Sequence, residues 1–296
     1  TAGWTDPGLT AAGVFYPASA ASPETRLQYY ADRFPVVEVD SPYYALPSRR
    51  AAELWVERTP DDFTFDVKAN ALMTGQPSEV KRLPKELRDA LPADLRQKAR
   101  IYGKDLPAEL YDAVWAWFVD ALAPLHAAGK LGAVLLQYPR WFLPNRANAA
   151  ELLDAKARLG EYRGAVEFRN HRWLTGRTRE RTLAHLAEHD LAFVMVDGPQ
   201  GLESSIPPVR AVTSGALGVL RLHGRRADTW ERPGVGVAER FRYLYDVGEL
   251  AGWVPELLGA ARETRRLHVI HNNCYANYGT TNALEMTRLL ADAAAG

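Results

Sequence analysis

Charged side chains alternate with apolar ones in several short segments of this chain. Glu38, for example, lies between Val37 and Val39. Because successive side chains of a β-strand point to opposite faces, such charged residues share one face of their strand. The ionisable residues of this kind are Glu38, Asp40, Asp66, Lys68, Glu167, Arg169, Asp197, Arg221 and His223. Acids and bases are nearly matched, so they either form one mutually satisfied ion network or build a reactive site.

Four of these residues belong to the types that carry out acid–base or nucleophilic catalysis. Glu38 and Glu167 are a candidate acid–base pair, provided that neighbouring charges separate their pKa values. Lys68 is either a Schiff-base nucleophile or an electrostatic clamp, and the many carboxylates favour the protonated clamp. His223 is either a proton shuttle or a histidine simply hydrogen-bonded to one of the two glutamates. We assign catalytic roles to these four.

Polar and aromatic residues at the ends of the same segments are expected to bind a substrate. They are Asp40, Tyr43, Gln137, Arg169, Trp173, Asp197, Arg221, Asn272 and Asn273. Arg169 and Arg221 carry forked N–H donors that suit a carboxylate or a phosphate. Phosphate sites of barrel proteins often use the last two strand loops, so Arg221, Asn272, Asn273 and the amides of 280–282 form a candidate anion site.

Aromatic side chains are also frequent near these segment ends. They are Trp4, Tyr43, Tyr44, Trp141, Trp173, Trp230, Tyr275 and Tyr278. Flat rings can stack on sugars or on nucleotide bases, and the alternative is that many of them only pack loops together. These rings are therefore compatible with either a sugar-like ligand or a nucleotide.

The sequence offers few metal ligands. The single cysteine, Cys274, excludes an internal disulfide and a cysteine cage. His185 and His189 lie one helical turn apart, but no Glu adjoins His185 as in a metalloprotease motif, which favours an ordinary surface helix. We therefore predict no metal site and no cofactor, with a single Mg²⁺ on carboxylate oxygens left open.

The segments that carry these residues read as parallel strands separated by helices. The expected strands are 36–40, 63–70, 132–138, 164–169, 192–197, 219–224 and 267–273, with a first strand ending near Trp4. Helical patterns lie between them at 23–34, 177–189, 255–266 and 282–293. Strand and helix in alternation predict an α/β fold, a TIM-type barrel of parallel strands. An open doubly wound sheet is the alternative, but no Gly-rich turn follows the first strand.

In a parallel barrel, helices cover the apolar strand faces, so the charged faces should point inward. Most of the charges lie toward the C-terminal ends of their strands, where active sites of this fold are built. This position favours a functional pocket over a purely structural ion network at the barrel floor.

One long insertion interrupts the repeat between the third and fourth strands. We expect a single domain, 1–296, in which 71–131 is a long helical excursion that serves as a lid or a binding element. Its basic residues are Lys81, Arg82, Lys85, Arg88, Arg96, Lys98, Arg100 and Lys104. They allow a nucleic-acid interface, although interspersed acids are more typical of a solvated helix face.

Composition limits the partners of this chain of 296 residues. Lys plus Arg and Asp plus Glu both number 36, so no net field attracts a polyanion or a membrane surface. We found neither a signal peptide nor an apolar run long enough to span a bilayer, and the lone cysteine suits a reducing compartment. We expect a cytoplasmic protein that does not bind membranes, of undetermined oligomeric state.

Several short motifs follow one another in a characteristic order. They include 37–41 with the tyrosines 43 and 44, 136–139, 166–169 with Trp173, 221–224, and the Asn272-Asn273 pair. In this order they resemble the YecE-like family, catalogued as domain of unknown function 72, nearly from end to end. The resemblance implies a TIM-type barrel and no settled activity.

Four positions differ from that family's usual pattern. Asp40 stands in place of the usual Asn, and Asn170 stands where a His commonly follows the Arg. His271 and Cys274 flank the Asn pair where Phe and His are frequent. These differences remove potential metal ligands, so the resemblance does not support a metal-dependent role.

The sequence is compatible with two functions. The first is a non-redox enzyme, of a hydrolase, lyase or isomerase type, that acts by acid–base and electrostatic catalysis on a small anionic, phosphorylated or sugar-like substrate. The second, less favoured, is a nucleic-acid-binding protein that uses the barrel mouth and the basic segment 76–105. A closed charged cup would favour the first, and a continuous positive groove across the mouth would favour the second.

Overall fold

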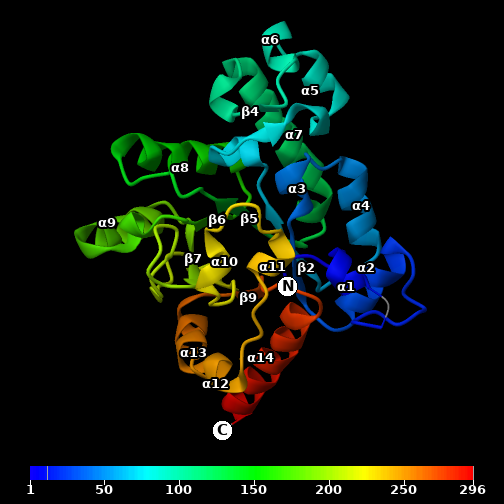
Figure 1. Ribbon diagram of the computed structural model, residues 1–296, viewed down its shortest axis with the longest axis vertical. Helices are drawn as coiled ribbons and strands as arrows, with labels where there is room; N and C mark the ends of the chain where they lie inside the picture. The colour runs from blue at the N-terminus through cyan, green and yellow to red at the C-terminus, as the bar shows by residue number, and fades with distance from the viewer. Residues whose placement is uncertain (12, 296) are drawn as a thin grey trace.

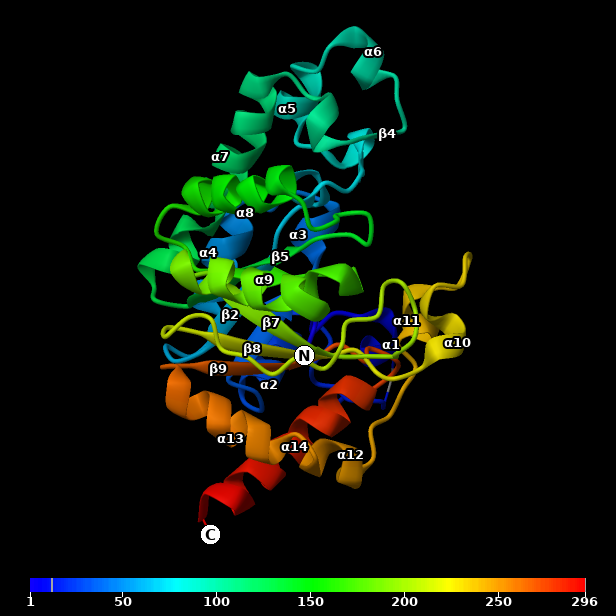
Figure 2. The same cartoon turned by 90° about the vertical axis from the view of Figure 1, so that its left-hand side faces the viewer.

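The computed structural model describes residues 1–11 and 13–295 of the chain. Seven parallel strands form one curved sheet, in which each strand pairs with the next along the chain (Figures 1 and 2). They are β1 (Val36–Val39), β2 (Thr64–Lys68), β5 (Leu131–Gln137), β6 (Gly164–Glu167), β7 (Ala192–Asp197), β8 (Gly218–Leu222) and β9 (Leu267–His271). All seven predicted strands are present, most of them shorter than expected by one to three residues.

The first residues of the chain fill the gap between the two edge strands. Ala2 makes a parallel bridge with Glu38, and the Glu38 amide donates to the Thr1 carbonyl at 3.0 Å. On the other side, the Ala2 amide donates to the His271 carbonyl at 3.2 Å. This short segment takes the place of the predicted first strand, so the nearly closed sheet confirms the TIM-type barrel.

Helices cover the outside of this barrel. The longer ones are α2 (Pro23–Ala31), α4 (Arg49–Glu57), α7 (Ala108–Ala127), α8 (Arg146–Leu159), α9 (Gly176–Glu188), α13 (Val254–Glu263) and α14 (Tyr278–Ala295). The start of α2 is encoded locally, because the Ser22 hydroxyl accepts from the Thr25 amide at 3.1 Å and Pro23 occupies the first turn. No helix among the described residues is both long and apolar enough to cross a membrane.

Apolar and charged side chains lie on opposite faces of the strands, as the sequence alternation predicts. Phe65 and Val67 of β2 are fully buried in the apolar cluster beneath the outer helices. Asp66, between them, points into the barrel and accepts from His268 of β9, with 2.8 Å between Oδ2 and Nδ1. Gly132 lies beside this pair, and a Cβ there would come within 2.4 Å of the Asp66 carboxylate. A buried polar pair therefore fills the lower barrel.

The insertion between β2 and β5 projects from one end of the molecule, at the top of Figure 1. Its elements are η1 (Ala71–Thr74), β3 (Ser78–Glu79), η2 (Val80–Arg82), α5 (Lys85–Asp89), α6 (Ala93–Arg96), β4 (Arg100–Ile101) and η3 (Gly103–Asp105). Helix α7 then returns along α4 to the barrel. The insertion's buried side chains, such as Leu87 and Leu95, belong to the same apolar cluster as the barrel core.

Short helices lie in the loops at the carboxyl ends of the strands. They are α1 (Pro7–Thr10), α3 (Ser41–Tyr44), α10 (Ala227–Trp230), α11 (Val237–Arg240) and α12 (Val247–Ala251). Figure 2 shows α10 and α11 beyond one end of the strands. The loops that carry them surround the barrel mouth.

Candidate functional site

A cavity of about 590 Å³ opens at the barrel mouth. Its cationic side chains are Lys68, Arg140, Arg169, Arg232 and Arg240, and its acidic ones are Asp6, Asp40 and Glu231. Its aromatic walls are Tyr43, Tyr44, Trp141, Trp230 and Phe241. We call this cavity the mouth basin. An excess of cations beside flat rings suits an anion attached to a planar or sugar-like group.

Lys68 and Asp40 lie side by side in the mouth basin. They come from the ends of adjacent strands, and Lys68 Nζ is 3.4 Å from Asp40 Oδ1. The same ammonium lies 4.6 Å from the centre of the Tyr43 ring. Tyr43 in turn donates its hydroxyl to Gln76 Oε1 at 2.8 Å, and Gln76 Nε2 donates to the Gln137 carbonyl at 3.0 Å. The insertion thus supplies Gln76, which fixes the wall that holds Lys68.

Arg169 is the second cation at the bottom of the basin. Its Nε lies 2.5 Å from Glu167 Oε1, and its Nη2 donates to Gln137 Oε1 at 3.1 Å. The guanidinium carbon lies 5.3 Å from the centre of the Trp230 ring. With 13% of its side chain exposed, Arg169 keeps part of its fork open to a ligand.

A fully buried ion cluster supports Arg169 from below. Arg221 donates from Nη1 to Glu167 Oε2 and from Nη2 to Glu38 Oε1. The side chains of Arg221 and Glu167 have no exposed surface, and Glu38 has 2%. None of these three lines the basin. The structure therefore brings together the predicted Glu38, Glu167 and Arg221, but one layer beneath the place where a ligand would lie.

The two glutamates of this cluster have separated pKa values. Burial raises the pKa of Glu38 to about 7, although the charge of Arg221 opposes the shift. Burial acts in the same direction on Glu167, but Arg169, Arg221 and His223 together hold the pKa of that carboxyl well below its usual range. Glu167 is thus the permanent anion, and Glu38 is the carboxyl that changes protonation near neutral pH.

His223 is held neutral beneath the basin. Burial, reinforced by Arg169, lowers its pKa to about 3. The Asn272 amide nitrogen lies 2.8 Å from His223 Nδ1, and Glu167 Oε1 lies 3.2 Å from Nε2. Arg169 Nη2 also lies 3.2 Å from Nε2, so this ring nitrogen lies between a cation and a carboxylate. This arrangement is the hydrogen-bonded alternative for His223, and it holds Asn272 at the edge of the basin.

Besides Arg221, three predicted binding residues lie outside the mouth basin: Trp173, Asn273 and Asp197. Trp173 is buried between aromatic rings, with its indole N–H on the Phe142 carbonyl at 2.6 Å. Asn273 is fully buried and donates to the Tyr243 carbonyl and to Asn282 Oδ1, each at 2.8 Å. Asn282 also accepts from the Tyr245 amide. These contacts and the enclosure of Arg221 mean that the candidate anion site around 272–282 is not assembled as one open pocket.

Asp197 is the third of these predicted binding residues. Its hydrogen bonds link strand β7 to the loop that follows β8. Its carboxylate accepts from Arg225 Nε and Nη2 at 2.9 and 2.7 Å. It also accepts from the Tyr245 hydroxyl and the Trp253 indole N–H, both at 2.8 Å. All its acceptor positions are occupied, so Asp197 positions a loop and does not line the basin.

Several residues of the basin were not expected from the sequence. Arg140 and Arg232 come from loops and Arg240 ends the four-residue helix α11, where no strand or helix periodicity marks them. Arg240 Nε is buried without a hydrogen-bond partner, while its Nη2 donates to the Arg232 carbonyl at 3.2 Å. Of these three, only Arg140 could have been proposed from the sequence, since it lies two residues after the end of the predicted strand 132–138.

The comparisons with known proteins agree with one another. The family model described as "Protein of unknown function DUF72" matches residues 1–296. The UPF0759 protein YunF of Bacillus subtilis is 32% identical over 289 residues, which cover 96% of this chain and 93% of that protein. A solved DUF72 structure from Thermotoga maritima is similar with a TM-score of 0.75 and 27% identity, over 98% of this chain and 97% of that one. A second, from Enterococcus faecalis, has a TM-score of 0.72 and 26% identity, over 90% and 93%.

Proposed function

This chain belongs to the DUF72 family of proteins of unknown function, and from that premise we propose that it is a non-redox enzyme for a small anionic substrate. The substrate carries a phosphate or carboxylate next to a sugar-like or planar part. The mouth basin binds it, and the chemistry is proton transfer assisted by fixed charges.

One observation carries this proposal: Lys68 and Arg169 both face the basin and are both held in place. Lys68 lies between Asp40 and the Tyr43 ring, and Arg169 lies between Glu167 and the Trp230 ring. Cations fixed in this way need no reorganisation to meet an anion, which is the basis of electrostatic catalysis. The aromatic walls then provide flat surfaces for the rest of the substrate.

Asp40 is the group best placed to take a proton from the substrate. Its side chain is 31% exposed, it lines the basin, and its Oδ1 has no hydrogen-bond partner besides the ion pair with Lys68. In the proposed step, a substrate proton moves to the Asp40 carboxylate, and the negative charge that develops on a neighbouring substrate oxygen is stabilised by the Lys68 ammonium. Lys68 acts as the clamp and forms no covalent bond.

The buried layer acts through Arg169 and Asn272. Glu167 and Gln137 orient Arg169, and His223 orients Asn272. Glu38, Glu167, Arg221 and His223 are therefore proposed to position the groups that touch the substrate and to set their charge. This assignment replaces direct catalytic roles for Glu38, Glu167 and His223.

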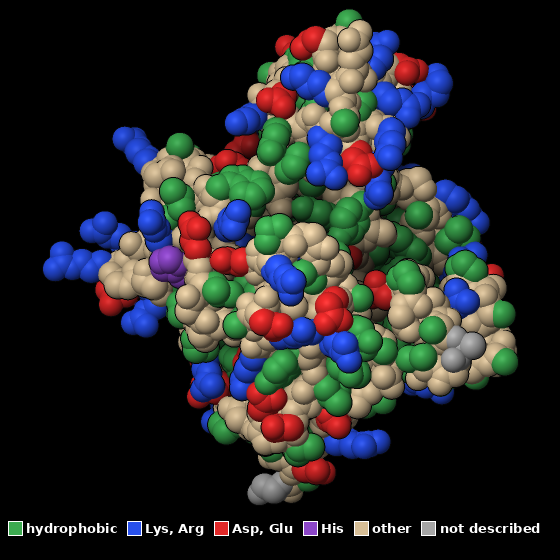
Figure 3. All heavy atoms as spheres, viewed as in Figure 1, with side chains coloured by type: hydrophobic (Ala, Val, Ile, Leu, Met, Phe, Trp, Pro, Cys, Tyr) green, Lys and Arg blue, Asp and Glu red, His purple; other side chains and the backbone are tan. Residues whose placement is uncertain are grey.

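Nucleic-acid binding has one observation in its favour. A hollow of about 420 Å³ on the insertion is lined by Lys81, Arg88, Arg96, Lys98 and Arg100, with Glu79 as its acid. Many of these charges are already engaged, because Glu79 pairs with Lys81 and Arg100, while Arg88 and Arg96 donate to backbone carbonyls. Basic and acidic side chains are interspersed over the face in Figure 3, which favours the small ligand.

The substrate class can be tested by capture. We would incubate the protein with a cell extract of small molecules, remove unbound material and identify retained ligands by native mass spectrometry. The wild type should retain an anionic molecule, and Lys68→Met should lose it, as should Glu167→Gln through the loss of Arg169 positioning. Arg50→Met, which removes an exposed cation on α4, is the matched control and should retain the ligand.

Two results would overturn the proposal. The first is equal retention of the ligand by the wild type and by folded Lys68→Met. The second is the retention of oligonucleotides in place of small molecules, with loss of that retention on changing Lys98 and Arg100.

A further inference from the structure

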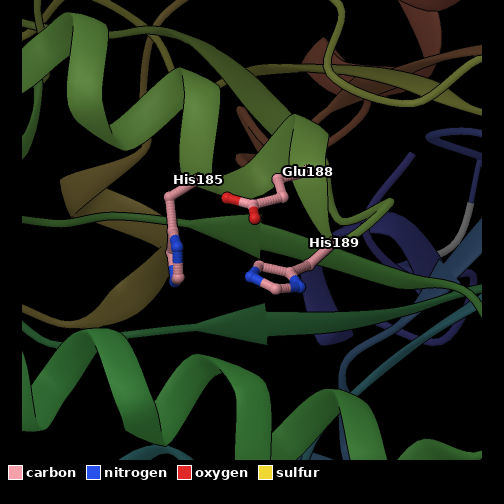
Figure 4. Close-up of side chains that lie close together, drawn as sticks. All are labelled: His185, Glu188 and His189. Carbon is pink, nitrogen blue, oxygen red and sulfur yellow. The ribbon is translucent and has the colours of Figure 1, made fainter.

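A second group of chemically active side chains lies on the outer surface, at the end of helix α9. His185 and His189 are four residues apart and therefore lie on one face of the helix. Glu188 adjoins His189, and Figure 4 shows the three side chains converging between α9 and the neighbouring elements. One ligand atom from each residue can be chosen so that all three lie within 4.8 Å of one another.

A separate contact orients the His185 ring. Its Nε2 lies 3.3 Å from the carbonyl oxygen of Ala149 on helix α8. A carbonyl can only accept, so this contact places the ring proton on Nε2 and leaves the Nδ1 lone pair free. Metal-binding histidines ordinarily donate their other ring N–H to such an oxygen, which fixes both the tautomer and the ring plane.

The donor set selects a class of ion. Two imidazoles and one carboxylate are the protein ligands of many four-coordinate Zn²⁺ sites, in which water takes the fourth position. Mg²⁺ and Ca²⁺ prefer oxygen ligands throughout. Tetrahedral bonds of about 2.1 Å to zinc place the ligand atoms about 3.4 Å apart, so the three side chains must draw closer together by side-chain rotation when the ion binds.

We propose that His185, Glu188 and His189 form a binding site for a borderline divalent cation of the Zn²⁺ class. The site is separate from the mouth basin, because α9 leads into the amino end of β7 and the basin opens at the carboxyl ends of the strands. With His185 directed at Ala149, the bound ion strengthens the contact between α9 and α8. Metal binding then stabilises the folded state in proportion to the metal concentration.

The test uses the whole chain without a polyhistidine tag. Isothermal titration with ZnCl₂ should show one equivalent bound per chain, and the melting temperature should rise with added Zn²⁺ but not with Mg²⁺. His185→Ala and His189→Ala should each weaken Zn²⁺ binding on the order of tenfold or more and remove the thermal shift. Glu188→Gln should weaken binding less, since an amide oxygen remains.

The matched control is His126→Ala on helix α7. His126 is a half-exposed histidine whose Nε2 lies 3.4 Å from Glu161, so it offers a similar His–Glu pair without a third ligand. This variant should bind Zn²⁺ as the wild type does. The proposal is overturned if the wild type binds no stoichiometric Zn²⁺, or if the His185 and His189 variants bind it as tightly as the control.

Discussion

Glu38 and Glu167 contact the two terminal nitrogens of the same guanidinium, yet their environments differ in one respect. Glu167 meets three basic groups, Arg169, Arg221 and His223, whereas Glu38 relies on Arg221 for its close cationic contact. The extra charge keeps Glu167 ionised, while burial dominates at Glu38 and raises its pKa to about 7. A change in the protonation of Glu38 alters the net charge beneath the basin by one unit.

We predict that anion binding depends on pH through Glu38. Below pH 7 Glu38 is protonated, the cluster is more positive, and binding is tighter; above pH 7 binding weakens, by roughly three- to tenfold for one charge several Å away. Sulfate is the appropriate probe, because its own charge is constant between pH 6 and 8. Its affinity can be measured by equilibrium dialysis across that range.

Glu38→Gln is the control for this titration, since it mimics the protonated carboxyl. The variant should bind sulfate at pH 8 more tightly than the wild type does at pH 8, with no step near pH 7. A separate step near pH 6 should remain, because Asp6 lines the basin and burial, reinforced by Asp40, raises its pKa to about 6. His223 adds no step there, because its pKa of about 3 keeps it neutral throughout. A step that persists unchanged in the variant would assign the titration to another group.

At the level of elements, the alternation within strands predicted the barrel and the inward side of most of the charges, Asp197 being an exception. Strand period and helical connections fix which way Glu38, Glu167 and Arg221 point. They do not fix how far each side chain lies below the surface of the basin, because that distance depends on which loops cover the strand ends. Gln76 from the insertion and the loop after β8 close over the strands. For that reason the sequence placed Arg221 in contact with a ligand, although it lies one layer below.

Asp197 shows how an element is fixed by one side chain. It accepts hydrogen bonds from Arg225, Tyr245 and Trp253, all in or just after the loop that carries the basin residues Arg232 and Arg240. A sequence read segment by segment cannot distinguish this outward carboxylate from the inward ones, because Asp197 ends its strand.

We predict that Asp197→Ala destabilises the fold by about 3–5 kcal/mol, because it leaves an arginine and two buried donors without their anion. Urea unfolding measures the loss, and hydrogen exchange should increase selectively across residues 224–253. Asp228→Ala removes an exposed partner of Arg226 and should leave the free energy of unfolding almost unchanged. Equal effects of the two substitutions would contradict a positioning role for Asp197.

At the level of the whole molecule, the charges are balanced but unevenly placed. Lys and Arg together equal Asp and Glu in number, yet the mouth basin holds five cations and three acids. Total composition could not show this imbalance, because three of the five cations lie in loops or in the four-residue helix α11, without a periodic pattern. A local excess without a net charge favours a small anion over a long polyanion.

Lys68 and Arg169 are the anion contacts of the basin on which the proposed function depends most directly. We would measure sulfate binding by equilibrium dialysis at pH 6 for the wild type, Lys68→Met, Arg169→Met and the surface control Arg50→Met. Each basin variant should lose about ten- to a hundredfold in affinity, the value of one charge-assisted hydrogen bond, while Arg50→Met binds as the wild type does. Equal sulfate affinity in all four proteins would contradict the account.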